Sequence, residues 1–275
     1  MVLYRVLEKE DFPFTEDTDD IEILYERYIH ELQFGITFQQ TGTTAPTLSE
    51  ALGVLSKIEI KLRGSVITEI TGQDLLAFDC LFLQHEPLYS LPSADTEYGY
   101  IEGLRLPLTI PAGSGTLAYR LFYTAQTPIT NYRINIARVE SEEVMEEGIY
   151  AIKRFDFTPP STGAENIALD TTFDGDLHAF LIYSTTIPTA SSTNATVKKI
   201  ILERGTTQIM KSTIFDLRTA VEYPRDSTIR GIVDNYLLID LRKNPIPAGE
   251  RVRLKIVSDD TNAVRIIPIT KIARR

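Results

Sequence analysis

The chain contains a single cysteine, three histidines and no tryptophan among its 275 residues. One cysteine, Cys80, excludes an internal disulfide, and because it lies among Phe78, Leu81 and Phe82 we expect a buried thiol and not a reactive one. Acidic residues outnumber basic ones by 38 to 28, and the formal charge is −10. Such a surface repels phosphate backbones, so we expect no direct nucleic-acid partner.

Long apolar runs are also missing. No stretch is long enough to span a bilayer, and the first residues lack the apolar core and small-residue cleavage site of a secretory signal. The sequence therefore predicts a protein that folds in a cytoplasm. The same acidic surface disfavours adhesion to anionic lipids.

The sequence motifs of common enzymes do not occur. There is no Gly-x-Ser-x-Gly elbow, His-Glu-x-x-His helix, Cys-x-x-Cys pair or phosphate-binding glycine loop. His30, His85 and His178 are scattered and form no His-x-His pattern, although a double-cupin metalloenzyme needs two or three histidines with a carboxylate in at least one barrel. We predict no catalytic residue, no cofactor-binding residue and no metal ligand.

Three aspartates, Asp170, Asp174 and Asp176, surround Gly175. Oxygen donors on a turn can hold calcium, but the Asp-x-Asp-Gly order of an EF-hand is absent. We favour an ordinary β-turn with solvated carboxylates and keep calcium as the alternative.

Most of the chain alternates apolar and polar residues with a period of two, which is typical of half-buried antiparallel strands. The clearest cases are Ile58 to Leu62, Leu104 to Ile110, Leu117 to Tyr123 and Tyr132 to Ile136. The exception is Asp74 to Leu83, whose apolar spacing suits a short helix. The composition is that of an all-β protein.

The N-terminal region follows a different pattern. Thr15 to Asp20 supplies capping side chains and acids suited to the start of a helix. Apolar residues then recur at helical spacing: Ile21, Leu24, Tyr25, Tyr28, Ile29 and Leu32. We predict one amphipathic helix over about residues 19–33. It would serve either as a lid on the first sandwich or as an arm that reaches a neighbouring subunit.

The second half of the chain repeats the first in order. Ile-Pro-Ala-Gly occurs at 110–113 and 246–249, and Ile-Ala-Arg at 136–138 and 272–274, both 136 positions apart, as are Tyr100 and Tyr236. Upstream the separation is 141 or 142 positions: Lys57-Ile58 with Lys199-Ile200, Arg63-Gly64 with Arg204-Gly205, and Asp74-Leu75 with Asp216-Leu217. Such a period is too long for solenoids or propellers and indicates a duplicated domain.

Two breaks separate the copies. Residues 140–147 form an acidic run that suggests a connector, and Thr158 to Gly163 is rich in turn-forming residues. We predict an N-terminal arm or helix over 1–35, a first jelly roll over 36–145 and a second over 146–275. The predicted fold is all-β, with two tandem eight-stranded antiparallel jelly-roll β-sandwiches and a short N-terminal helix.

With this tandem organisation over roughly 36–275 and its two Ile-Pro-Ala-Gly units, the chain resembles the double jelly-roll major capsid proteins of icosahedral viruses with an internal membrane, in the compact form found in corticovirus-like bacteriophages. The resemblance implies no enzyme but a homotrimer whose six sandwiches form a pseudo-hexagonal capsomer of a virion capsid. It also implies neighbouring capsomers and other virion proteins, such as penton or minor capsid proteins, as partners. It leaves open whether a viral membrane lies beneath the shell. The chain lacks the long tower-forming insertions of larger members.

Two alternatives come from other classes. A tandem β-sandwich could be a binding module, such as a phage tail or baseplate component or a glycan-binding protein, and a saturable glycan signal would favour it. A double-cupin enzyme would carry one transition metal per chain. A capsid subunit needs complementary surfaces and no reactive group, and it predicts a stable homotrimer.

Overall fold

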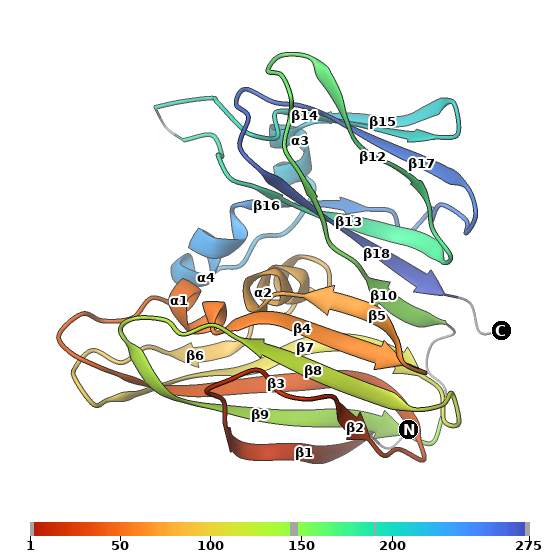
Figure 1. Ribbon diagram of the computed structural model, residues 1–275. Helices are drawn as coiled ribbons and strands as arrows, with labels where there is room; N and C mark the ends of the chain where they lie inside the picture. The colour runs from red at the N-terminus through yellow and green to blue at the C-terminus, as the bar shows by residue number, and fades with distance from the viewer. Residues whose placement is uncertain (1–2, 144–147, 190, 273–275) are drawn as a thin grey trace. The chain divides into compact units, whose positions relative to one another are not determined.

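The computed structural model describes residues 3–143, 148–189 and 191–272. The chain divides into two compact units, unit 1 (Met1–Tyr150) and unit 2 (Ala151–Ala273), and each is a β-sandwich (Figure 1). The predicted division lay between residues 145 and 146. Part of the predicted connector, residues 144–147, lies outside the described residues.

Unit 1 contains two antiparallel sheets. The first has the strand order β1-β9-β3-β7-β6, and the second has the order β5-β4-β8-β2. The strands are β1 (Leu3–Pro13), β2 (Ile21–Ile23), β3 (Tyr28–Gln40), β4 (Leu55–Leu62), β5 (Ser65–Ile70), β6 (Leu88–Ser90), β7 (Tyr98–Ile110), β8 (Leu117–Tyr123) and β9 (Ile129–Ser141). The apolar residues of the alternating pattern point inward between the sheets, as Phe34 and Ile60 do.

Two short helices belong to unit 1, α1 (Leu48–Gly53) and α2 (Gly72–Leu81). The Thr71 hydroxyl caps α2 by accepting a hydrogen bond from the Asp74 amide. Gly72 is required at the first position because a Cβ there would clash with the carbonyl oxygen of Leu52. The short helix predicted over Asp74 to Leu83 is confirmed.

Unit 2 also has two antiparallel sheets. One contains β16, β13 and β18 in that order, with β10 and β11 beside β18, and the other has the order β12-β17-β14-β15. The strands are β10 (Ile149–Ile152), β11 (Phe155–Phe157), β12 (Glu165–Thr172), β13 (Asp176–Ser184), β14 (Lys199–Arg204), β15 (Thr207–Thr213), β16 (Tyr236–Asp240), β17 (Arg251–Val257) and β18 (Val264–Ile272). Helices α3 (Ile214–Thr219) and α4 (Ser227–Val233) lie between β15 and β16 in the chain.

The two units share one strand order. If β6 is set aside and β10 and β11 are counted as one interrupted strand, each unit has eight strands. In both, the first, eighth, third and sixth strands form one sheet, and the second, seventh, fourth and fifth form the other. This is the jelly-roll topology, so the expected tandem of eight-stranded antiparallel sandwiches is confirmed.

The repeated sequence motifs occupy equivalent places in the two units. Lys57 and Lys199 lie in the fourth strands, and Asp74 and Asp216 are each third in the helix that follows the fifth strand. Pro-Ala-Gly forms the turn before the seventh strand in both units, with left-handed glycines at positions 113 and 249. In each turn the amide after the glycine donates to the proline carbonyl, at 3.2 and 3.3 Å. The last two residues of the second Ile-Ala-Arg motif lie outside the described residues.

The helix predicted over residues 19–33 is wrong. These residues form β2 and the first part of β3, and Leu24, which a helix would bury, is 82% exposed in the turn between them. The expected capping residues bind β8 instead, because the Thr18 hydroxyl accepts from the Leu121 amide and an Asp17 carboxylate oxygen accepts from the Tyr123 amide. The first 35 residues therefore supply strands to both sheets of unit 1.

The core of unit 2 lies between its sheets. Its largest member is Phe180 of β13, which is fully buried and packs edge-on against Phe173 at a ring distance of 6.3 Å. Ile200, Leu254 and Ile266 approach from β14, β17 and β18. Among the described residues, no helix combines the length and apolar character that crossing a membrane requires.

Candidate interaction surfaces

The three histidines are on separate elements. His30 lies in β3, where its Nε2 is 2.6 Å from the Ser141 hydroxyl, and His178 lies in β13. His85 follows α2 and contacts Asp79. Within residues 3–143, 148–189 and 191–272, no group of three or more His, Cys, Asp or Glu side chains is placed to hold a metal ion.

Cys80 is buried in α2, at 3% exposure. Burial, together with the nearby acidic groups of Asp79 and Glu86, raises the pKa of its thiol. The thiolate is the reactive form of cysteine, so this environment disfavours reaction. The prediction of a buried thiol is confirmed.

The predicted aspartate cluster is divided among different contacts. Asp170 lies in β12 and receives hydrogen bonds from Arg251 at 2.7 Å and from Arg253 at 3.1 Å. The Arg251 hydrogen bond is the main cause that lowers the pKa of the Asp170 carboxyl to about 2. An Asp176 oxygen accepts from the Ala248 amide at 2.9 Å. The ordinary turn with solvated carboxylates stays the prediction, and calcium stays its alternative.

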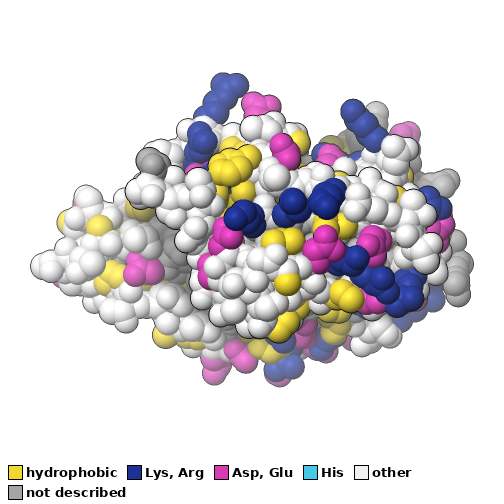
Figure 2. Space-filling view, turned by 90° about the horizontal axis from the view of Figure 1, so that it is seen from above, with side chains coloured by type: hydrophobic (Ala, Val, Ile, Leu, Met, Phe, Trp, Pro, Cys, Tyr) yellow, Lys and Arg dark blue, Asp and Glu magenta, His cyan; other side chains and the backbone are white. Residues whose placement is uncertain are grey.

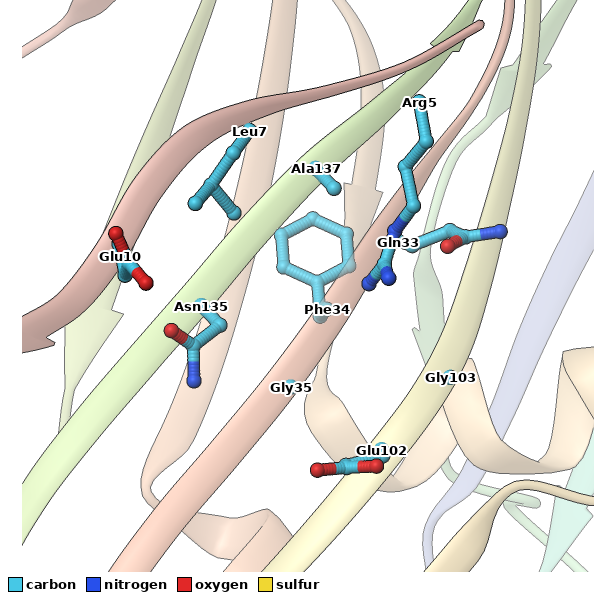
Figure 3. Close-up of a pocket in the computed structure, with 10 residues that line it drawn as sticks. All are labelled: Arg5, Leu7, Glu10, Gln33, Phe34, Gly35, Glu102, Gly103, Asn135 and Ala137. Atoms are coloured by element: carbon cyan, nitrogen blue, oxygen red, sulfur yellow. The ribbon is translucent and has the colours of Figure 1, made fainter. Parts of the chain in front are cut away.

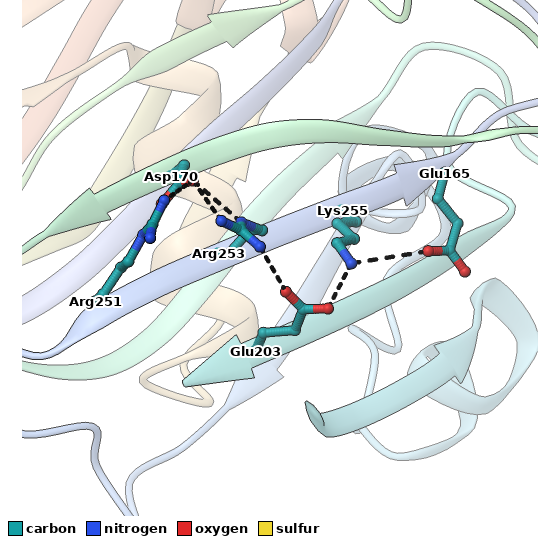
Figure 4. Close-up of polar contacts among 6 residues, drawn as sticks. All are labelled: Glu165, Asp170, Glu203, Arg251, Arg253 and Lys255. Atoms are coloured by element: carbon teal, nitrogen blue, oxygen red, sulfur yellow. Dashed lines mark hydrogen bonds and ion pairs between the residues drawn. The ribbon is translucent and has the colours of Figure 1, made fainter. Parts of the chain in front are cut away.

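Asp170 is part of a row of alternating charges on the outer face of the β12-β17-β14-β15 sheet (Figure 4). Arg253 also contacts Glu203 at 3.4 Å, Glu203 accepts from Lys255, and Lys255 lies 3.9 Å from Glu165. Figure 2 looks onto the side of the molecule where these strands lie, and there basic and acidic side chains are interleaved. The positive and negative charges of this row are paired with one another within the chain.

Unit 1 has a buried acid next to a histidine. The Asp79 side chain is fully buried, and its Oδ2 lies 2.9 Å from His85 Nδ1 and accepts from the Arg105 amide at 3.2 Å. Burial raises the pKa of the Asp79 carboxyl to about 8 and lowers the pKa of His85. Both shifts favour the neutral forms, with the proton on the carboxyl group.

A groove of about 420 Å³ crosses the outer face of the β1-β9-β3-β7-β6 sheet (Figure 3). We call this face, with its groove, the unit 1 outer face. The groove is lined by Arg5, Leu7, Glu10, Gln33, Phe34, Gly35, Glu102, Gly103, Asn135 and Ala137. It is hollow because the positions at its centre carry little or no side chain: Gly35, Gly103 and Ala137 come from three neighbouring strands.

The sequence analysis did not identify this groove. The alternation in β3 could have indicated a polar and small outer row, since Gln33, Gly35 and Thr37 alternate with buried Phe34 and Ile36. No sequence signal shows that Gly35 lies beside Asn135 and close to Ile101, because that depends on pairing between strands far apart in the chain.

No protein-family model matches the chain, and no curated protein sequence matches it. Solved structures do match it, and three of them align over at least 91% of their own length. The STIV major capsid protein aligns with a TM-score of 0.74 at 12% identity, covering 99% of this chain and 97% of its own. A chain in the atomic structure of Sulfolobus Turreted Icosahedral Virus gives 0.76 at 12% identity, covering 98% of this chain and 91% of its own.

The major capsid protein P2 of bacteriophage PM2 aligns with a TM-score of 0.62 at 12% identity, covering all of this chain and 98% of its own. At such low identity the likeness concerns the fold, and it extends through both units. It agrees with the strand order found twice in this chain. The protein therefore has the double jelly-roll fold of these viral major capsid proteins, as the sequence resemblance implied.

Proposed function

We propose that the protein is the major capsid subunit of an icosahedral virus, a structural virion protein without enzymatic activity. The observation that carries this proposal is the whole-length likeness to major capsid proteins of STIV and PM2, which includes both sandwiches. A partial likeness to one sandwich would point only to a common β architecture. Two sandwiches in one chain match the subunits of those viruses in size and in order.

Three copies would form a homotrimeric capsomer in which six similar sandwiches give a pseudo-hexagonal outline. The duplicated strand order supports this arrangement, because each chain supplies two units of one topology. Assembly of this kind needs complementary surfaces and no reactive group. The subunit would fold in the host cytoplasm and end in the virion capsid, next to neighbouring capsomers and other virion proteins such as penton or minor capsid proteins.

The test is the assembly state of the purified full chain. Mass photometry should give the mass of three 31.0-kDa chains, and negative-stain images should show particles with a pseudo-hexagonal outline. A monomer at every concentration up to the solubility limit would contradict the proposal. A stoichiometric transition metal or a saturable glycan-binding signal from such a monomer would favour the cupin or the binding-module alternative.

A further inference from the structure

The unit 1 outer face carries much of the chain's exposed apolar surface. Ten large apolar side chains are strongly exposed among the described residues, and five of them are on this face. They are Leu3, Leu7, Leu88, Tyr98 and Tyr100. Leu88 pairs with Glu102 across β6 and β7, which places Leu88 with Tyr98 and Tyr100 on the side that lines the groove. Concentrated apolar and aromatic exposure of this kind marks a surface that binds another protein.

The charged groups of the groove make no ion pair within the described part of the chain. Among the residues that the structure describes, Arg5, Glu10 and Glu102 make no ion pair, although all three line one groove (Figure 3). The charged row around Asp170, by contrast, is paired throughout. Unpaired charges beside exposed rings are suited to contacts that a partner completes.

The edge of the same sheet is also open. β1 is an 11-residue strand that pairs with β9 on one side and ends the sheet on the other. A long edge strand offers backbone donors and acceptors to another chain. The face and the edge together form a surface that a protein can cover.

Unit 2 has a patch of matching chemistry. β15 is the edge strand of its sheet, and it exposes Ile209 and Lys211, followed by exposed Phe215 at the start of α3. Among the described residues Lys211 has no ion pair. The groove on unit 1 contains two unpaired carboxylates and one unpaired guanidinium, so an apolar patch with a single lysine complements it in charge.

We propose that the unit 1 outer face of one copy docks on the β15 edge and the start of α3 of a second copy. This inference rests on the proposed self-assembly and adds the two surfaces that make the contact. Because the surfaces lie on different parts of the chain, the contact can repeat head to tail around a closed ring of copies, as the proposed trimer requires.

The first experiment compares Tyr100→Glu with Leu24→Glu in the full chain. Both place a carboxylate at an exposed apolar position of unit 1, but Leu24 lies outside the unit 1 outer face. Circular dichroism and thermal unfolding verify that each variant folds. Exchange of fluorescently labelled subunits then reports dissociation even when the assembly is too tight to dilute. We expect Tyr100→Glu to accelerate exchange about tenfold or more, because interface changes act mainly on dissociation, and Leu24→Glu to leave it unchanged.

The second experiment tests which surfaces meet. Lys211→Glu and Glu102→Lys should each accelerate exchange by about tenfold, and the double variant should return to within about threefold of the wild type because it restores opposite charges. If only variants of the unit 1 outer face weaken assembly, the contact is made by that face alone and the proposed pairing is wrong.

The outcomes separate this inference from the proposed function. A wild-type chain that stays monomeric overturns both. A wild-type trimer in which Tyr100→Glu exchanges at the wild-type rate overturns the docking surface and leaves the capsid role standing.

Discussion

The protonated state of Asp79 predicts an unusual dependence of stability on pH. Its carboxyl group is fully buried, and its Oδ1 has no hydrogen-bond partner within the described part of the chain. Burial is the main cause of the raised pKa of about 8, Glu31 adds to it, and the amide and charge of Arg105 oppose it. At neutral pH the folded protein thus keeps a proton that the unfolded chain releases.

The sign follows from proton linkage. An aspartate has a pKa of about 3.9 in an unfolded chain, so between about pH 4 and 8 the folded state holds one more proton at this site. The stabilising contribution is complete below the unfolded pKa and is lost as pH rises through the folded pKa. Within that window the free energy of unfolding falls by about 1.4 kcal/mol per pH unit from this group, or about 2.7 kcal/mol from pH 5 to 7.

Asp79→Asn removes the titratable carboxyl group and keeps a side chain of nearly the same shape. The amide oxygen can take the place of Oδ2 and accept from the Arg105 amide. The side-chain NH₂ group of the variant has no hydrogen-bond partner among the described residues. This lowers the free energy of unfolding by a constant amount of about 1–3 kcal/mol. The decisive quantity is the slope: from pH 5 to 7 the stability of the wild type relative to the variant should fall by about 1.4 kcal/mol per pH unit.

The assay is urea unfolding at pH 5, 6 and 7, followed by tyrosine fluorescence and circular dichroism at one fixed protein concentration, since assembly also affects apparent stability. Asp174→Asn removes an exposed carboxylate from unit 2 and serves as the control for the loss of one negative charge. Parallel curves for the wild type and Asp79→Asn would refute the reasoning, because the carboxyl group would then be ionised in the folded protein at pH 5.

Further substitutions test the packing, the caps and the turns. Phe180→Ala should cost about 3–5 kcal/mol, because it empties part of the unit 2 core, as measured by urea unfolding. Thr71→Ala and Thr213→Ala each remove a helix cap and should each cost about 1 kcal/mol, visible as lowered unfolding temperatures; no change in either would contradict the capping bonds. Gly249→Ala should lower the stability by about 1 kcal/mol, because φ is +79° there. Gly231→Ala, inside α4, should raise the stability by about 0.5–1 kcal/mol. Calorimetry that gave changes of the same sign for both variants would count against the turn geometry.

The duplicated fold could be predicted because local sequence patterns indicate it. Alternation identifies the strands, and paired motifs such as those at Asp74 and Asp216 recur because both units cap a helix at the same point of the fold. Pro-Ala-Gly recurs because both turns need a left-handed residue at Gly113 and Gly249. Each of these requirements acts within a few residues of the chain.

The N-terminal strands could not be predicted because their partners are distant. Tyr28 and Leu32 fit a helical spacing, yet β3 pairs with β7 and β9, which lie at least 58 residues further along the chain. Hydrogen bonds and buried side chains from those strands outweigh a local preference. The same holds for Asp79, whose place on a short helix was foreseen but whose burial against Arg105 depends on where β7 lies.

The distribution of ion pairs over the described surface agrees with the proposed docking face. On the outer face of the β5-β4-β8-β2 sheet, Lys61 contacts Asp20 at 2.6 Å and Lys57 contacts Glu59 at 2.7 Å, as the paired charges do around Asp170 in unit 2. Exposed pairs of this kind add little stability, but removing them from water would be costly, so they discourage association. In the groove of the unit 1 outer face, Arg5, Glu10 and Glu102 make no ion pair with any described residue, and aromatic rings are exposed beside them. Covering this groove removes apolar surface from water and gives these charges partners. A chain that must assemble in one way only is therefore expected to place exposed rings and unpaired charges on both of its docking surfaces.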